Sequence, residues 1–350
     1  MAYTDIDKPS DYFETVLYTG TGSTQSITSL DFQPDWVWGK TRNDTQDHQI
    51  IDSVRGATKL LATNGTAAEF TDTNNLTSFN SNGFTVGSSG GINGSSDTLV
   101  TWCWKAGTSV SGNTGGSGTA KSYSGSVNTD AGFSITSFTG NGTIGHTIPH
   151  SLNAIPSMFI IKKYGGSGDS TARDWDVYHQ SLGNTKVIFL NTTAAYSTSN
   201  EYWNDTTPTS SVITLGANDQ INGNNNTYIC YAFAEKQGYS KFGSYVGNGN
   251  ADGTFVYTGQ KSAFIMVKST GGESNWQMSD NKRNTFNEVN KHLRANSSGA
   301  EFTNYPIDFL SNGFKLRATD TDTNGSGTTY IFMAFAENPF TTSTGVPATA

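Results

Sequence analysis

Three stretches of the chain repeat one hydrophobic pattern. They read LVTWCWKAG from Leu99, YICYAFAEK from Tyr228 and YIFMAFAEN from Tyr330. Apolar residues stand at consecutive positions in these stretches, which is typical of a strand buried on both faces. Upstream of the first and third copies, FNSNGFTVG and FLSNGFKLR each predict a turn followed by an alternating strand. The pattern therefore predicts one strand-rich unit that occurs three times.

Turns and lysines at matching positions extend the repeat well beyond that strand. Each copy opens on a glycine turn (YTGTG, FTGNG or YVGNG) and continues into an apolar strand that ends in lysine. An Asn-Gly pair, which favours a tight hairpin turn, stands six residues before each final strand. We predict that three segments share one β-fold with equivalent lysines. They are residues 15–106 with Lys40, 132–237 with Lys162 and 239–340 with Lys268.

The fold class that follows is all-β, with three tandem small β-sandwich modules of the jelly-roll or lectin-like kind. Apolar residues occur at helical spacing within Asn284–Asn296, so a short helix is expected there. The Gly/Ser/Thr-rich residues 107–131 predict a flexible linker between the first two modules. We expect residues 1–14 to be an N-terminal attachment segment and residues 341–350 to be a C-terminal tail.

Composition and charge argue against several classes of partner. The net charge of −8 and the pI near 5.1 give no attraction to nucleic acid. No stretch approaches the roughly 18 consecutive apolar residues of a membrane-spanning helix, and the N-terminus lacks a signal-peptide pattern. Cys103 and Cys230 stand on the final strands of different copies, so a disulfide between them is not expected. We expect a protein made in a reducing cytoplasm, with no cofactor and with neither nucleic acid nor membrane as partner.

Several segments together resemble a known family of repeat proteins. The opening MAYTDIDKPSDYF, the FQPDWVWGK strand, DSVRGATKLL, LTSFNSNGFTVG and the WCWKAG ending are similar to virion proteins of tailed phages that infect marine bacteria. Those proteins are often labelled tail-fibre-like or concanavalin-like lectin-like. The resemblance covers essentially the whole chain, implies a virion role and a β-sandwich fold, and supplies no catalytic residues.

The function expected on this basis is that of a bacteriophage virion structural protein located in the virion. We expect it to be a component of a tail fibre or appendage that binds glycan on the host cell surface, and not an enzyme. Two alternatives stay open at this point. One is a capsid decoration or head-fibre protein with a purely structural role, and the other is a tail-borne glycan depolymerase.

Aromatic and acidic residues in the second copy are the candidates for sugar chemistry. Trp175 and Trp203 with Asn204 and Asp205 could form a carbohydrate-binding platform, because aromatic faces stack on pyranose rings while amides and carboxylates bind hydroxyls. A role for both tryptophans in the hydrophobic core ranks ahead of this interpretation. For a depolymerase, two carboxyls among Asp174, Asp176, Glu201 and Asp205 would have to lie about 5–9.5 Å apart. We predict that they do not converge in this way.

One segment of the third copy resembles the start of a calcium-binding loop. DTDTNGSG offers Asp320, Asp322 and Asn324 as oxygen ligands at the usual spacing. The twelfth position, where such a loop has a bidentate glutamate, is Ile331. The same residues also form the predicted Asn-Gly hairpin turn, which is the favoured interpretation.

The N-terminal segment suggests a further partner. Tyr3, Ile6, Tyr12 and Phe13 have no core of their own to enter, so we expect this segment to be ordered only by another virion protein or a sister chain. Single sandwiches also leave exposed edge strands, which closed cyclic symmetry would bury. These arguments predict a homo-oligomer, most simply a homotrimer.

Overall fold

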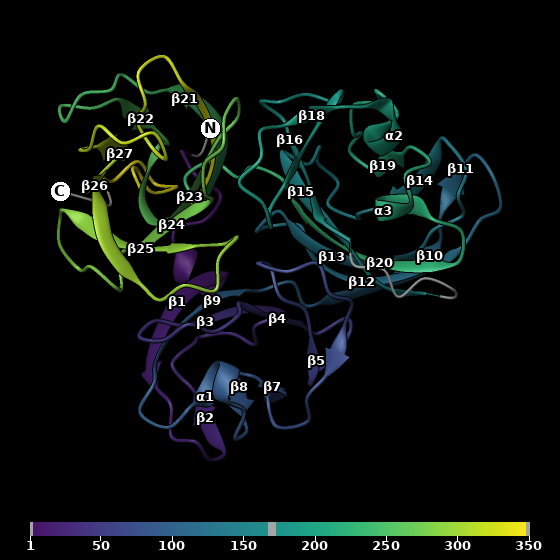
Figure 1. Ribbon diagram of the computed structural model, residues 1–350, viewed down its shortest axis with the longest axis horizontal. Coiled ribbons are helices and arrows are strands. Elements are labelled where there is room, and N and C mark those ends of the chain that lie inside the picture. The colour runs from purple at the N-terminus through teal and green to yellow at the C-terminus, as the bar shows by residue number, and fades with distance from the viewer. Residues whose placement is uncertain (1–2, 167–172, 348–350) are drawn as a thin grey trace.

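The computed structural model describes residues 3–166 and 173–347, and these residues fold almost entirely as β-strands (Figure 1). The prediction of an all-β fold is confirmed. Among the described residues the helices are one 3-10 turn and three α-helical turns of four residues each. None of the helices in this part of the chain is long and apolar enough to cross a membrane.

The strands fall into three successive groups, which we call the first, second and third repeats. The first repeat holds η1 (Pro9–Asp11), β1 (Phe13–Thr19), β2 (Gln25–Ile27), β3 (Trp36–Thr41), β4 (Gln49–Asp52), β5 (Lys59–Leu60), β6 (Phe70–Thr71), β7 (Leu76–Asn80), β8 (Gly83–Val86), α1 (Gly90–Asn93) and β9 (Thr98–Trp104). The second holds β10 (Thr108–Asn113), β11 (Gly115–Gly116), β12 (Ser122–Asn128), β13 (Phe133–Thr139), β14 (His146–Pro149), β15 (Met158–Gly166), β16 (Trp175–His179), β17 (Lys186–Phe189), β18 (Ser197–Thr198), α2 (Asn200–Trp203), β19 (Val212–Leu215), α3 (Asp219–Asn222) and β20 (Asn226–Phe233). The third holds β21 (Ser240–Val246), β22 (Phe255–Tyr257), β23 (Gln260–Ser269), β24 (Gln277–Asp280), β25 (Val289–Arg294), β26 (Phe302–Leu310), β27 (Gly313–Leu316) and β28 (Thr329–Pro339).

The main sheet of each repeat has the same strand order. In the orders β1-β9-β3-β4, β13-β20-β15-β16 and β21-β28-β23-β24, the last strand of the repeat lies between the strand that leads into the opening glycine turn (β1, β13 or β21) and the strand that carries the equivalent lysine (β3, β15 or β23). The register also agrees, because Lys40, Lys162 and Lys268 each pair with the same position of that last strand. Their partners are Val100, Ile229 and Ile331 respectively. The three lysines are therefore structurally equivalent, as the sequence spacing predicts.

The central strands are apolar on both faces because each main sheet contributes to two cores. In β20, Tyr228 and Cys230 point into a core within the second repeat, while Ile229 and Tyr231 point to the other side. That other side belongs to one large core, the central core, to which all three repeats contribute. Trp36 of the first repeat illustrates the packing, since its ring lies 4.6 Å from that of Tyr231 and 5.8 Å from that of Phe133.

The three repeats surround the central core instead of following one another along a stalk. In Figure 1 the first repeat lies at the bottom, the second at the upper right and the third at the upper left. Each repeat contacts the other two, as shown by the ring contacts of Trp36 with Tyr231, Phe13 with Phe335 and Phe233 with Phe335. Burial of the second face of each sheet therefore depends on the presence of the other two repeats.

The segment expected to be a flexible linker, residues 107–131, is ordered in strands, so that prediction is wrong. β10 pairs with β12 and β12 pairs with β13, which extends the main sheet of the second repeat by two strands. Small residues do not prevent this pairing, because the hydrogen bonds of a sheet come from the backbone. Ser126 contributes further by accepting a hydrogen bond of 2.8 Å from the amide of Gly107.

The short helix expected within Asn284–Asn296 is also absent, and that segment instead contains strand β25. Val289 and Leu293 are buried, but each packs in a different core, the first in the core of the third repeat and the second in the central core. Residues four apart on a regular strand point to the same side. Here a register shift between Val289 and Lys291 turns Val289 and Leu293 to opposite sides, so their helix-like spacing serves two cores. The α-helical turns lie elsewhere, and two of them are capped, by Ser199 and Asn218.

The N-terminal segment folds back onto its own chain, which corrects the prediction that a partner orders it. Ile6 is buried in the central core, and Tyr12 packs against that core. The Thr4 hydroxyl donates to the carbonyl of Gln237 at 2.7 Å, at the junction of the second and third repeats. Near the other end of the chain, the amide of Ser343 donates to Asp7 at 2.6 Å. The expected homotrimer rested partly on an unpaired N-terminal segment and loses that support.

Candidate functional site

The two tryptophans predicted to form a sugar platform lie in hydrophobic cores, so that prediction is wrong for them. Trp175 and Trp203 are each 1% exposed. Trp203 packs edge-on against Phe159, and its indole donates to the carbonyl of Lys186 at 2.9 Å. No ring face is left for a sugar to stack on, and the preferred interpretation of both residues as core aromatics is confirmed.

The two polar members of that set lie on the surface beyond α2. Asn204 ends α2 in the left-handed conformation, with φ of 50°, and its amide donates to the carbonyl of Asn200. Asp205 is exposed, and its backbone carbonyl accepts a hydrogen bond of 2.7 Å from the side chain of Asn184. Without the indole faces, these two residues form a turn and not a binding platform.

The acidic residues considered for a depolymerase stand in different environments. Asp174 accepts a hydrogen bond of 2.7 Å from Asn191, whereas Glu201 and Asp205 are exposed. Asp176 is buried, neither of its carboxylate oxygens has a hydrogen-bond partner, and burial raises its pKa well above the usual value. The bond of Asp174 is structural, because an equivalent bond occurs in each of the other repeats. There Asp47 accepts from Asn64, and Asn275 accepts from Asn296.

The candidate calcium ligands are engaged by protein donors. Asp320 accepts hydrogen bonds from the amide and hydroxyl of Thr323 at 2.8 and 2.7 Å. Asp322 accepts from Gln277 at 2.7 Å and from the amide of Asn275 at 3.1 Å. In the described part of the chain, no group of three or more His, Cys, Asp or Glu side chains is placed to hold a metal ion.

The third candidate ligand, Asn324, belongs to a structural set that recurs in every repeat. Asn93, Asn222 and Asn324 are fully buried. Each carboxamide oxygen accepts from the backbone of the opening glycine turn, at Thr21, Asn141 and Asn248 respectively. This set joins the first hairpin of a repeat to the turn before its last strand, which explains why both turns recur at fixed spacing.

We predict that replacement of Asn222 by alanine destabilises the fold by about 2–4 kcal/mol. The side chain accepts from Asn141 and contacts His146 Nδ1 at 2.8 Å, and it donates to the carbonyls of Thr143 and Gly216. Its loss leaves several buried groups unpaired, each at a cost of about 1 kcal/mol or more. Urea unfolding measures the change, and the exposed Asn224→Ala variant, expected within about 0.5 kcal/mol of wild type, is the control. Equal stabilities would contradict the role given to Asn222.

Equivalent hydrogen bonds join each repeat to its neighbour around the central core. A ring nitrogen of each repeat bonds to the equivalent backbone carbonyl of a neighbouring repeat, at 2.9 Å in every case. The pairs are Trp175 with Ala62, Trp276 with Phe189 and His48 with Arg294. They join the second repeat to the first, the third to the second and the first to the third, so the ring of contacts closes.

A second set of bonds runs around the same ring. Asp52, His179 and Asp280 occupy one structural position, opposite Trp36, Met158 and Phe264. Each bonds to a neighbouring repeat: Asp52 with the Tyr231 hydroxyl at 2.8 Å, His179 with the Phe332 carbonyl at 3.1 Å and Asp280 with the Trp102 indole at 3.1 Å. The two aspartates also form buried ion pairs with Arg55 and Arg283, each 2.6 Å long.

Two of the three equivalent lysines, Lys162 and Lys268, also donate hydrogen bonds across these interfaces. Lys162 donates to the carbonyls of Thr66 and Arg173 at 2.7 and 2.5 Å, and Lys268 donates to that of Thr193 at 3.0 Å. Burial lowers the pKa of Lys40, Lys162 and Lys268 to about 8. Lys162 and Lys268 therefore tie repeats together, whereas Lys40 donates to the carbonyls of Thr41 and Asp44 within its own repeat.

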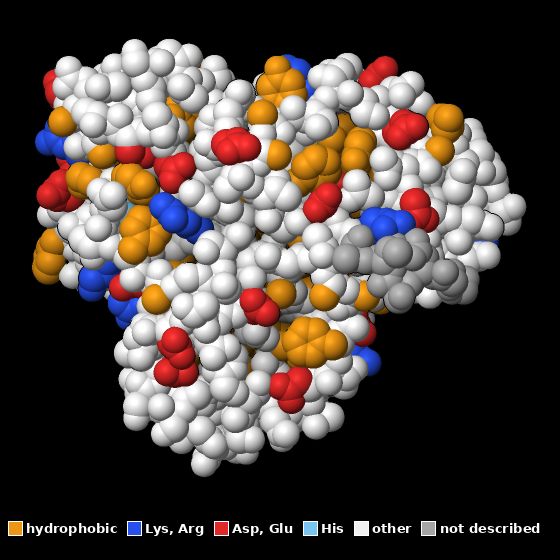
Figure 2. Space-filling model, viewed as in Figure 1, with side chains coloured by type: hydrophobic (Ala, Val, Ile, Leu, Met, Phe, Trp, Pro, Cys, Tyr) orange, Lys and Arg blue, Asp and Glu red, His pale blue; other side chains and the backbone are white. Residues whose placement is uncertain are grey.

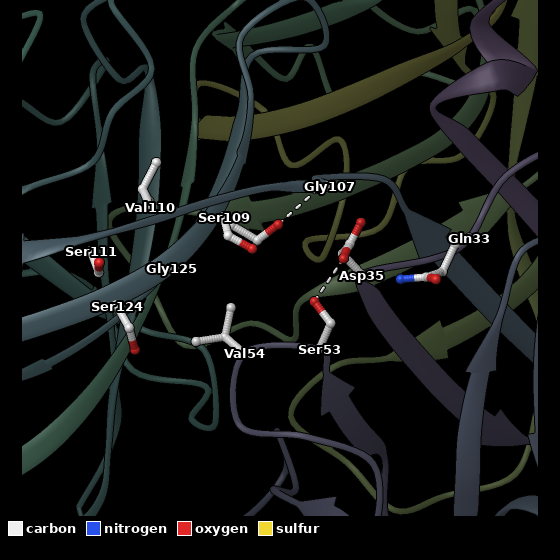
Figure 3. A pocket seen from close by; sticks show the side chains of 11 residues that line it. Gln33, Asp35, Ser53, Val54, Gly107, Ser109, Val110, Ser111, Ser124 and Gly125 are labelled. Carbon is white, nitrogen blue, oxygen red and sulfur yellow. Dashed lines mark hydrogen bonds between the residues drawn. The ribbon is translucent and has the colours of Figure 1, made fainter.

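One surface pocket lies between the first repeat and the β10–β12 pair, with a volume of about 480 Å³ (Figure 3). Serines line much of it, and Asp35 lies at one side. Both carboxylate oxygens of Asp35 are used, one by the Ser53 hydroxyl at 2.7 Å and one by the Ala106 amide at 2.8 Å. Burial raises the pKa of Asp35 above its usual value. The carboxylate of Asp35 is therefore already engaged by protein donors at the wall of this pocket.

A second pocket, of about 530 Å³, lies where the two ends of the chain approach each other. Tyr3, Tyr257 and Phe340 line it together with Glu235 and Gln237. Sequence reasoning missed this set, because its members come from the N-terminal segment, the third repeat and the C-terminal segment. One local signal is present, since the alternation in FVY, from Phe255 to Tyr257, places Tyr257 on the side of β22 opposite the buried Val256.

Comparison with known proteins gives one match. A family model described as "Domain of unknown function (DUF7483)" matches residues 8–339, which is nearly the whole chain and includes all three repeats. No curated protein and no solved structure matches the chain. The protein belongs to the DUF7483 family.

Proposed function

We propose that the protein is a non-enzymatic structural component of a tailed-phage virion, placed in a tail fibre or appendage, where it binds glycan on the host cell surface. The similarity of several segments to virion proteins of marine phages motivates the virion role. The observation that carries the proposal is the closed ring of equivalent contacts, which makes three repeats into one rigid body around the central core.

Rigidity of this kind suits a component that works outside the cell. Cys103 and Cys230 are free and buried, so the fold depends on packing and hydrogen bonds and not on a disulfide. The surface seen in Figure 2 is mostly neutral and polar, with scattered charges and small hydrophobic areas. Such a body tolerates dilution and solvent, and its repeats present equivalent turns at three places, an arrangement that suits multivalent contact with a cell surface.

Two measurements test this proposal. Immunogold labelling of the source phage is expected to place the protein on the tail, and the purified, fluorescently labelled chain is expected to bind host cells. Label on the head alone would overturn the tail placement in favour of a capsid decoration or head fibre. Release of soluble sugar from host glycan by the purified chain would overturn the non-enzymatic role in favour of a depolymerase.

A further inference from the structure

We propose that the pocket lined by Tyr3, Tyr257 and Phe340 is a binding site for a neutral pyranose sugar. We call it the terminal pocket. It rests on the proposed function, because it assigns a place and a ligand class to host glycan binding. The site differs from the Trp175 and Trp203 platform, whose indoles are buried.

The first argument is the exposure of the aromatic rings. Tyr3 is 60% exposed, Tyr257 61% and Phe340 38%, and all three line one concave site. Large aromatic side chains are normally buried, and a cluster of exposed ones marks an interaction site. A volume of about 530 Å³ lies within the range of small-molecule sites and accommodates one or two sugar rings.

The segments that carry these rings are held together near the ends of the chain. The Phe340 amide donates to the Gly259 carbonyl at 3.2 Å, in the turn that follows Tyr257. Gly345 lies so close to Tyr3 that an added Cβ would stand 3.2 Å from the ring. The hydrogen bonds from Ser343 to Asp7 fix the C-terminal segment against the N-terminal one. Segments that are already ordered lose little conformational entropy when a ligand binds.

The charge of the pocket favours a neutral ligand. Glu235 and Lys241 form an ion pair of 2.6 Å, so these two charges cancel within the pocket. Gln237 is exposed at the same site, and its carboxamide offers both a donor and an acceptor to sugar hydroxyls. Aromatic faces beside a carboxamide match the two sides of a pyranose, which has C–H faces and a rim of hydroxyls.

The strand edge next to the pocket argues against a peptide as the occupant. An extended peptide would need the free backbone groups of β21, the outermost strand of its sheet. At Phe242 those groups are already used, since the amide donates to Glu235 at 3.3 Å and the carbonyl accepts from Gln180 at 2.7 Å. Strand addition is therefore blocked at this point, whereas a sugar needs only side chains.

Saturation-transfer NMR of the full chain tests the site, with the methyl glycosides of glucose, galactose, mannose and N-acetylglucosamine as probes. We expect transfer to the ring protons of at least one probe, and affinity about tenfold lower in Tyr257→Ala. Gln237→Ala, which removes an exposed carboxamide, is expected to weaken binding as well. Phe255→Ala is the matched control, because Phe255 is a 44% exposed aromatic on the same strand outside the pocket. It should bind like wild type.

No transfer to any probe would overturn the sugar site, as would binding that Tyr257→Ala and Gln237→Ala leave unchanged. Absence of transfer together with failure of Tyr257→Ala to enter virions would point to a protein segment as the occupant. Binding of wild-type chain to host cells is scored separately. Cell binding that survives Tyr257→Ala overturns this site and leaves the proposed function standing, whereas absence of cell binding by the wild type overturns the proposed function itself.

Discussion

Replacement of Asp52 by alanine is expected to lower the free energy of unfolding by about 3–5 kcal/mol, because it leaves a buried charge without its partner. The Arg55 guanidinium is 1% exposed and its Nε lies 2.6 Å from the Asp52 carboxylate. The same carboxylate accepts from the Tyr231 hydroxyl and from the amides of Val54 and Arg55. Arg55 would keep only Glu69 and the Ile50 carbonyl as partners. Guanidinium chloride unfolding followed by tryptophan fluorescence measures the change.

A surface carboxylate supplies the control for this experiment. Asp252 is 77% exposed and pairs with Lys315 and Arg317, so Asp252→Ala is expected to leave the unfolding midpoint close to that of the wild type. Exposed pairs are screened by water and salt, whereas the buried pair of Asp52 and Arg55 is screened much less. A loss below about 1 kcal/mol in Asp52→Ala would show that the buried pair is dispensable.

A double-mutant cycle tests whether Asp52 joins two repeats. Tyr231→Phe removes the hydroxyl that donates to Asp52 across the interface between the first and second repeats. If the bond couples the repeats, the two changes are not additive, and Tyr231→Phe costs less in the Asp52→Ala background than in the wild type. Equal costs in both backgrounds would mean that the interface does not depend on this contact.

The sequence predicted the parts of the fold that depend on local spacing. Gly-x-Gly turns, Asn-Gly pairs and lysines at fixed intervals are consequences of one hairpin arrangement, so their recurrence predicted the shared strand order and the equivalence of Lys40, Lys162 and Lys268. Strands with apolar residues at consecutive positions predicted burial on both faces of the sheet. The sequence did not indicate that the second face would meet two other copies of the same sheet, because hydrophobicity does not specify its partner.

The errors have a common physical cause, which is contact over long sequence distances. Trp175 resembled a sugar platform because no local feature shows that its indole bonds to Ala62 in another repeat. Ile6 lacked a visible core because that core is completed by residues of all three repeats. The terminal pocket escaped notice for the same reason, since Tyr3 and Tyr257 meet only after the chain closes.

Mild acid is expected to unfold the protein steeply below pH 6.5, because all five of its histidines are buried in the neutral form. Burial lowers the pKa of His150 and His179 to about 4 and that of His48 and His292 to about 3, and it lowers the pKa of His146 as well. His48 shows why protonation is resisted: its Nδ1 accepts a hydrogen bond of 2.8 Å from the Trp38 indole, and its Nε2 faces the Arg294 carbonyl. A proton on Nδ1 would break the first of these bonds.

Stability falls as the pH falls, because the histidine pKa values in the folded protein lie below the unfolded value near 6.5. Below pH 6.5 the unfolded chain binds protons that the folded chain does not, so the stability present above pH 6.5 is lost as the pH falls toward 3–4. Three carboxyls with raised pKa values, Asp35, Asp176 and Asp320, act in the opposite direction. On unfolding in this pH range the five histidines take up protons and up to three carboxyls release them. The net uptake is therefore two to five protons. That uptake corresponds to about 3–7 kcal/mol per pH unit.

Over one or two pH units, a loss at this rate equals the whole free energy of unfolding of an ordinary domain. We therefore expect unfolding near pH 5. Urea midpoints measured from pH 8 to pH 4.5 give the slope. His179→Gln removes one titrating group from the interface between the second and third repeats and should reduce the slope by about 1.4 kcal/mol per pH unit. His179 bonds to the Phe332 carbonyl, so its protonation weakens the ring of contacts that closes the three repeats. A midpoint that stays constant between pH 6.5 and 4.5 would show that the histidines are free to titrate in the folded protein, and the closed ring would then not be what excludes protons from them.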